Sequence, residues 1–108
     1  MQIIFHSHHA PVSDRLRLRA EQGVRKLADR LGGAVDAVIR FEGDGPTRRV
    51  EIVMHASRHR RLVAGGEGRY LGPALSKAMD GLRDQIARAR RVRSKGARRR
   101  AALKAQQT

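Results

Sequence analysis

Alternation of apolar and polar residues predicts four β-strands along the 108 residues of the chain. A two-residue period marks a half-buried strand, because successive side chains point to opposite faces. The period occurs at residues 2–6, 35–41, 50–55 and 61–64. Glycine-, proline- or serine-containing segments at 42–46, 57–59 and 65–68 follow the last three, and we expect them to form turns or loops.

Apolar residues at helical spacing predict a first helix that ends at Leu31. Ser13 is a good N-cap for it, and the pair Gly32-Gly33 supplies the stop. Because an α-helix turns by about 100° per residue, a row of basic residues is expected to lie beside the apolar stripe of this helix, and we call it the ridge. The apolar stripe consists of Leu16, Ala20, Val24, Leu27 and Leu31, and the ridge of Arg15, Arg19, Lys26 and Arg30.

A second helix is expected to begin near Gly72, with Pro73 tolerated in its first turn. Basic residues lie roughly opposite its apolar stripe, interrupted by Asp84. The apolar stripe consists of Leu75, Ala78, Met79, Leu82, Ile86 and Ala89, and the basic positions are Lys77, Arg88, Arg91 and Lys95.

The predicted order of elements is β-α-β-β-β-α. Two helices can cover one face of a four-stranded sheet, which gives an α+β fold in the form of a two-layer sandwich. If the first two strands pair in parallel, the crossover through the first helix should be right-handed. This topology is similar to the double-stranded-RNA-binding fold, whose order α-β-β-β-α lacks the first strand.

The charge of the chain is strongly positive and unevenly distributed. Lys and Arg total 24 against 10 Asp and Glu, a net charge of +14. Residues 88–104 contain nine basic side chains and no acidic one. Such a block usually marks an interaction tail, and from residue 94 on the apolar periodicity is lost. We therefore expect a folded domain at residues 1–93 and a basic tail at 94–108 that is disordered without a partner.

The excess of basic residues on two helices and a tail favours a nucleic-acid partner over mere solubility. Arg is more frequent than Lys, and its planar fork suits phosphate oxygens. Aromatic residues make up only 3% of the chain, which argues against a stacking platform for single strands. Folded RNA recognised through its backbone fits the composition better.

Enzymatic and metal chemistry have little support in the sequence. Cysteine is absent, which excludes disulfides, thiolate metal sites and a cysteine nucleophile. Ser7 has no base and orienting acid in a known motif, and no phosphate-binding glycine loop is present. The five histidines lack carboxylates at a recognisable ligand spacing. We therefore expect no catalytic residue, no metal, no cofactor and no small-molecule substrate.

Membrane insertion is not expected either. No apolar run approaches the ~20 residues that span a bilayer. The N-terminus lacks the basic and apolar regions of a signal peptide. These features point to a cytoplasmic protein.

Several short segments in a common order resemble the ribosome hibernation promoting factor family in its short form. This family includes the ribosome-associated inhibitor A proteins and was once called the sigma-54 modulation proteins. The resemblance covers about residues 1–95. It is carried by Met1-Gln2-Ile3, His8-His9, Val12-Ser13-Asp14, Leu16-Arg17, Lys26-Leu27, Ala64 to Gly68, Ala74-Leu75, Met79-Asp80, Leu82 and Gln85-Ile86.

The resemblance implies a specific function. Family members bind rRNA of the small ribosomal subunit in the channel between head and body, where they compete with mRNA and tRNA. Translation is inhibited in resting or stressed cells, and occupancy needs no active site. By position, the resemblance assigns rRNA contacts to Arg25, Lys26, Lys77, Arg83, Arg88, Arg90 and Arg91. With the ridge residues Arg15, Arg19 and Arg30, these are the candidate rRNA-binding residues.

Two other binding functions remain open at this point. One is a nonspecific RNA- or DNA-binding protein that acts like a chaperone. The other is a polybasic peripheral membrane protein, although the tail lacks the aromatic or aliphatic anchors that such proteins usually carry. We expect charge reversal at Lys26 together with Arg88 to weaken ribosome binding without unfolding the domain.

Overall fold

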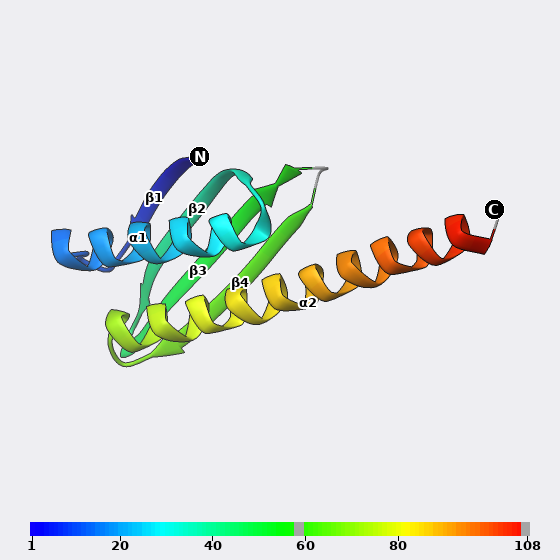
Figure 1. Ribbon diagram of the computed structural model, residues 1–108. Coiled ribbons are helices and arrows are strands. Elements are labelled where there is room, and N and C mark those ends of the chain that lie inside the picture. Colours follow the sequence, from blue (N-terminus) through cyan, green and yellow to red (C-terminus); the bar gives the residue numbers. More distant parts are fainter. Residues whose placement is uncertain (58–59, 107–108) are drawn as a thin grey trace.

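The computed structural model describes residues 1–57 and 60–106, and it describes side chains as far as Arg91, apart from Val35. The elements occur in the predicted order (Figure 1). They are β1 (Gln2–His8), α1 (Asp14–Leu31), β2 (Ala34–Asp44), β3 (Thr47–Ala56), β4 (Arg61–Gly68) and α2 (Leu71–Gln106).

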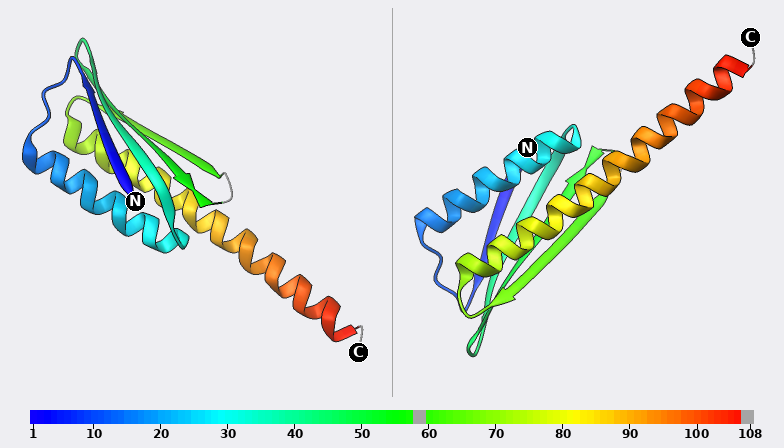
Figure 2. Two further views of the ribbon diagram at one scale, coloured as in Figure 1. Left: turned by 90° about the horizontal axis from the view of Figure 1, so that it is seen from above. Right: turned by 60° about the horizontal axis from the view of Figure 1, so that its bottom comes forward.

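The four strands form one sheet in the order β1-β2-β3-β4. β1 pairs with β2 in parallel, with α1 as the crossover between them, and the other two pairs are antiparallel. Both helices lie on the same face of the sheet (Figures 1 and 2). The α+β two-layer fold is therefore confirmed.

The ends of α1 are set by the two residues that the sequence indicates. The Ser13 hydroxyl accepts a hydrogen bond from the Leu16 N–H at 3.1 Å, which satisfies one of the free donors of the first turn. Gly32 has a φ of 85°, and its N–H donates to the carbonyls of the last turn. Only a residue without a Cβ adopts this left-handed conformation without strain.

The core lies between the helices and the inward row of each strand. Ile39 and Ile52 are opposite each other in the register of β2 and β3, and both are fully buried. From the other layer, Val24 of α1 and the α2 residues Leu75 and Leu82 are also fully buried. Removal of this apolar surface from water contributes about 25 cal/mol per Å² and holds the two layers together.

Two turns differ in extent from their predicted positions. β2 continues to Asp44 and β3 starts at Thr47, so the connection is a tight turn at residues 45–46 with a φ of 56° at Gly45. The prediction of a loop at residues 65–68 is wrong, because β4 extends through Gly68 and pairs with β3 there. The turn predicted at 57–59 includes residues 58 and 59, which lie outside the described residues.

The continuation of β4 has a packing reason. Gly66 is buried opposite Val50, and α2 lies directly over it. A Cβ at this position would clash with backbone atoms of Ala74 and Ala78. The glycine therefore permits close approach of helix and strand, whereas glycine-rich sequence alone suggests a loop.

Helix α2 continues through Gln106 and projects past the strands (Figures 1 and 2). This differs from the sequence expectation, which placed the end of regular structure near residue 93. Ala, Arg, Lys, Leu and Gln, which dominate the segment, are favourable helix formers. A helical segment of about a dozen residues without tertiary packing is marginal in water. That the tail at 94–108 is disordered without a partner stays a prediction, and residues 107–108 lie outside the described residues.

Candidate nucleic-acid interface

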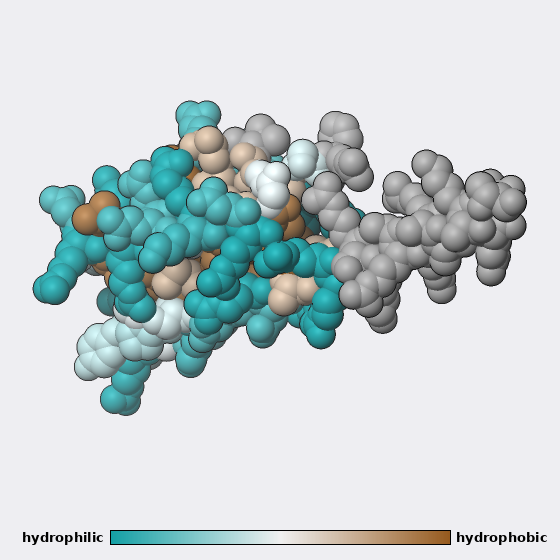
Figure 3. Space-filling model, viewed as in Figure 1, coloured by the Kyte–Doolittle hydropathy of each residue, from teal (hydrophilic) through white to brown (hydrophobic). Residues whose placement is uncertain are grey.

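The helical layer, formed by α1 and the part of α2 up to Arg91, has a positive outer surface. Six Lys and Arg against three Asp and Glu in α1, and five against two in this part of α2, give +3 for each helix. The face of the molecule on which the helices lie is covered mostly by hydrophilic side chains (Figure 3). Phosphate groups can approach this layer because its core residues point the other way.

The line along which α1 and α2 meet is fixed by two contacts. At Gly23 the helices come so close that a Cβ would be 2.5 Å from the Met79 sulfur. One turn earlier, the Arg19 Nη2 donates a hydrogen bond of 2.5 Å to the Ser76 hydroxyl. Positions 19 and 23 of α1 and positions 76 and 79 of α2 therefore lie on the flanks that face the other helix.

Helical periodicity extends these flanks along both helices, because residues three, four and seven apart share one face. On α1 the positions around Gly23 carry four of the predicted binding residues. On α2 the positions that follow Ser76 and Met79 carry two more. All six side chains are exposed, and we call them the basic stripe: Arg15, Arg19, Lys26, Arg30, Arg83 and Arg90.

The other four candidate residues do not join the basic stripe. Arg25 reaches the opposite flank of α1, where it bonds Glu21 at 3.1 Å and the Met1 carbonyl at 3.0 Å. Lys77 donates to the Glu67 carbonyl at 2.9 Å, at the β4 edge of the sheet.

Arg88 and Arg91 also lie off the basic stripe. Arg88 is three turns along α2 from Lys77 and shares its flank. Arg91 lies on the outer face of α2 with Asp80 and Asp84, which follows from spacings of eleven and seven residues. The structure therefore divides the ten candidates into one group of six and four dispersed residues.

The basic stripe carries almost no compensating charge from the protein. Arg83 forms an ion pair with Asp80 at 3.2 Å, and both side chains are more than half exposed. Such a pair contributes little in water. Within the described residues the other five members form no ion pair. Their charges are balanced by counterions in the free protein, and a polyanion that displaces these ions gains free energy.

The face of the sheet away from the helices, here called the open face, has a different electrostatic character. Across β2 and β3, opposite charges face each other directly in the register, as in Arg40 and Glu51. Arg49 also bonds Glu67 of β4 at 2.9 Å. With neutral histidines, three basic and five acidic side chains give −2: Arg40, Arg49 and Arg61 against Asp36, Glu42, Asp44, Glu51 and Glu67. A polyanion therefore has no electrostatic reason to bind here.

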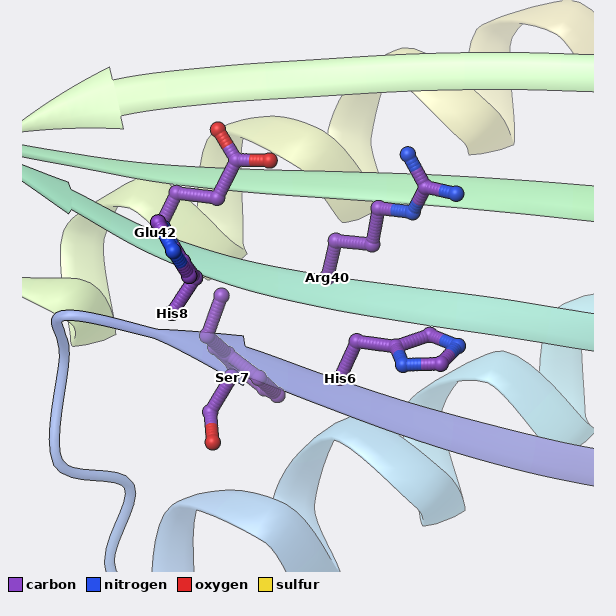
Figure 4. A pocket seen from close by; sticks show the side chains of 6 residues that line it. His6, Ser7, His8, Arg40 and Glu42 are labelled. Atoms are coloured by element: carbon purple, nitrogen blue, oxygen red, sulfur yellow. The ribbon is translucent and has the colours of Figure 1, made fainter.

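The histidines near the end of β1 lie on the open face in a shallow pocket. His6, Arg40 and Glu42 project to one side of the strands, whereas Ser7 points to the other (Figure 4). Ser7 is therefore separated from its neighbouring histidines. Within residues 1–57 and 60–106, no three His, Asp or Glu side chains gather as they would around a metal ion.

In the part of the chain that the structure describes, neither helix is long and apolar enough to cross a membrane.

The sequence alone does not show which basic residues become neighbours. Its periodicity identifies the outer positions of each helix but not the flank that faces the other helix. The signal for that flank is Gly23, a small residue within a helix, which allows the close contact with Met79. Ser76 is the residue that sequence reasoning missed. Its hydroxyl accepts from Arg19 and holds that side chain on the basic stripe.

Comparison with known proteins gives a family and a fold. Residues 3–94 match the model of the family described as Sigma 54 modulation protein / S30EA ribosomal protein. Among curated protein sequences, none matches the chain.

Two solved structures share the fold. The chain is similar to a ribosomal subunit interface protein from Coxiella burnetii, with a TM-score of 0.73, 16% identity and coverage of 83% of this chain and 98% of that one. It is also similar to the Protein Y N-terminal domain from Thermus thermophilus, with a TM-score of 0.70, 22% identity and coverage of 82% and 98%.

Proposed function

Because the chain belongs to the Sigma 54 modulation protein / S30EA ribosomal protein family, we propose that it is a ribosome hibernation factor. It binds rRNA of the small ribosomal subunit in the channel for mRNA and tRNA, and it inhibits translation in resting or stressed cells. The basic stripe is the surface that contacts the rRNA. The proposed site of action is the cytoplasm.

The observation that carries this proposal is the concentration of unneutralised cations on one flank of each helix. Five of the six stripe residues are arginines, whose planar guanidinium groups fit phosphate oxygens in a bidentate manner. Each neutralised phosphate releases condensed counterions, which gives a favourable and salt-dependent binding free energy. A row of such contacts along two helices suits the phosphate backbone of folded RNA.

The proposed mechanism is occupancy of a site that mRNA and tRNA also need. All three molecules then compete for one channel, and bound protein excludes the two nucleic acids. Inhibition by occupancy of the channel needs no catalytic residue, cofactor or small-molecule substrate. The dispersed residues Arg25, Lys77, Arg88 and Arg91 would add contacts where the channel wall surrounds the domain, and the tail at 94–108 would add further electrostatic attraction.

A nonspecific RNA- or DNA-binding role is the second candidate. The observation that favours it is the tail, where residues 93–104 hold six basic side chains and no acidic one. A charge block of this kind binds any polyanion.

Co-sedimentation with separated ribosomal subunits at physiological salt tests the proposal. Excess tRNA and excess unrelated duplex RNA are added in parallel as competitors. We expect one copy to pellet with each small subunit, displaced by tRNA and not by the duplex. Equal binding to both subunits that any RNA displaces would contradict the proposal and support the nonspecific role.

A further inference from the structure

The open face carries an apolar row that crosses all four strands. In the register, Ile4 lies opposite Val38, Val38 opposite Val53, and Val53 opposite Val63. Directly opposed residues share one face of a sheet. Ile4 and Val63, at the two ends of the row, are 40% and 41% exposed. This apolar row lies on the surface where the chain is least positive.

Charged residues flank the apolar row in a regular arrangement. On one side, Arg40 of β2 faces Glu51 of β3, and the next pair has the opposite order, with Glu42 on β2 and Arg49 on β3. On the other side, Asp36 of β2 faces His55 of β3, whose Nδ1 lies 2.5 Å from the Asp36 carboxylate. Arg40 and Glu42 of β2 therefore each have an opposite charge at the same level of β3, and Asp36 has a hydrogen-bonding histidine.

This arrangement is complementary to itself under one particular rotation. A two-fold axis parallel to the strands, between β2 and β3, lays β2 of one copy on β3 of a second copy at the same level. Arg40 then faces Glu51 of the second copy, and Glu42 faces its Arg49. Val38 faces Val53, and the exposed Ile4 and Val63 cover each other. From the register and the charges, we propose that the open face binds a second copy of this chain.

The alternative face-to-face rotation has its axis across the strands and lays each strand on its own counterpart in the reverse direction. With this axis at the level of Val38, Asp36 faces Arg40 of the second copy, but Glu51 faces His55, and Glu42 and Arg49 have no charged partner. The axis parallel to the strands sets both arginine–glutamate pairs of β2 and β3 against their complements in the second copy. It gives more pairs of opposite charge and is therefore the favoured dimer geometry.

The size of the face sets the strength of the association. Four strands about 4.8 Å apart and seven residues long at about 3.3 Å each give a projected face of about 450 Å². This is at the low end for a specific interface, so the dimer is weak and forms at high protein concentration. Aligned sheets pack about 30° apart, which keeps the central strands β2 and β3 in register and lets the corners diverge.

The proposed dimer keeps the two functions of the molecule on separate surfaces. The helical layers lie on the outside of the pair, with both basic stripes exposed. The strongly positive regions are thus far apart, and at physiological salt charges separated by more than about 8 Å are largely screened. RNA binding and self-association then do not compete for the same residues.

Sedimentation equilibrium of the nucleic-acid-free protein tests this inference over a range of concentrations in physiological salt. We expect the weight-average mass to rise from one copy to two. Arg40→Glu and Glu51→Arg each create two like-charge pairs in the dimer, and each should raise the dissociation constant at least tenfold. An equimolar mixture of the two variants should regain the wild-type mass, because the rotation sets each altered residue against its new complement in the other copy.

The mixture distinguishes contacts between copies from contacts within one sheet. Arg40 and Glu51 are also neighbours in the same sheet, and a variant that lost only this contact would not recover on mixing. Val63→Glu is a second variant that disturbs no cross-strand charge pair, and it should also give monomers. Arg69→Glu, which changes the charge by the same amount as Arg40→Glu but lies outside the face, should leave the dimer intact. Thermal unfolding curves verify that all variants are folded.

A wild-type protein that stays monomeric at all concentrations would overturn the inference. It would also be overturned by single variants that still dimerise, or by a mixture that stays monomeric. None of these outcomes bears on ribosome binding, because the basic stripe is on the other layer.

Discussion

The two surfaces of this small domain differ in how they neutralise charge. On the open face, β2, β3 and β4 supply countercharges to one another, as Arg49 and Glu67 show with a distance of 2.9 Å. On the helical layer, six cations lie along the flanks where α1 and α2 meet. Among the described residues, the exposed Asp80 is the only carboxylate that forms an ion pair with one of them. The first surface supplies most of its countercharges within the free protein, whereas the second requires anions from outside. Net charge alone therefore does not identify a binding surface, and the distribution of partners does.

The strongest test of this contrast reverses charge on one surface at a time. Lys26→Glu together with Arg83→Glu should lower affinity for the small subunit on the order of 100-fold, since a hydrogen bond to a charged group contributes about 1.5–3 kcal/mol. The matched control, Arg40→Glu together with Arg61→Glu, changes the net charge equally on the open face. It should leave the affinity within about threefold, well under the 1.4 kcal/mol of a tenfold change. Co-sedimentation titrations measure both values.

A related pair of variants sharpens the position of the binding surface. Lys26→Glu together with Arg88→Glu should weaken binding less than the first pair, by about tenfold, because Arg88 lies on the flank toward β4 and one tenfold step corresponds to 1.4 kcal/mol. Equal losses for the two pairs would show that the whole helical layer, rather than the basic stripe, contacts RNA.

Substitutions at two glycines test how the helical layer packs on the sheet and how its two helices pack together. Gly66→Ala should lower the free energy of unfolding by about 2 kcal/mol, as overpacking typically does, because the new Cβ meets backbone atoms of α2. Gly23→Ala should have a small effect, since the group it meets is the flexible end of Met79, and alanine favours helix by up to about 1 kcal/mol. Urea denaturation of both variants gives the comparison, and a larger loss for Gly23→Ala would contradict the described packing.

Salt dependence gives a smaller and more quantitative measure. Arg30→Gln should reduce the slope of log K against log salt by about one, the amount expected for one lost phosphate contact. Arg61→Gln removes the same charge from the open face and should leave the slope unchanged. Binding isotherms at four or five salt concentrations give these slopes. Equal slopes for the two variants would contradict the claim that RNA contacts the basic stripe and not the open face.

The smallest effect is expected on the open face itself. Arg49→Ala removes the exposed pair with Glu67, and such pairs contribute about 0.2–1 kcal/mol. Thermal or urea unfolding should show a change within that range, and small-subunit affinity should stay constant. A loss of affinity in this variant would indicate that RNA contacts the open face, which would contradict our account.

The fold could be predicted from the sequence because local signals agree with one another. Alternation marked four strands, Ser13 and Gly32 marked the ends of α1, and the order of elements left one simple arrangement of layers. The prediction of a loop at residues 65–68 was wrong for a reason that is not local. Glycine there serves the packing of α2, and only the tertiary structure shows that backbone atoms of Ala74 and Ala78 lie over Gly66.

The candidate site was less predictable than the fold. Periodicity identified exposed cations on each helix, and all ten candidates are exposed. It could not distinguish the flank of α1 that faces α2 from the flank where Arg25 bonds the Met1 carbonyl. That distinction depends on the contact between Gly23 and Met79, which joins residues far apart in the chain. The grouping of Arg83 and Arg90 with the ridge of α1 follows from this contact and from the hydrogen bond between Arg19 and Ser76.

Photo-crosslinking to purified small subunits tests the central claim most directly. A photoreactive side chain is placed at Gln22, an exposed position of α1 between the stripe residues Arg19 and Lys26, or at Val63 on the open face. We predict that the protein labelled at Gln22 crosslinks to rRNA and that excess tRNA abolishes the crosslink, whereas the protein labelled at Val63 gives no rRNA product. Crosslinks to rRNA from Val63, or equal yields from both positions, would contradict the assignment of RNA binding to the helical layer.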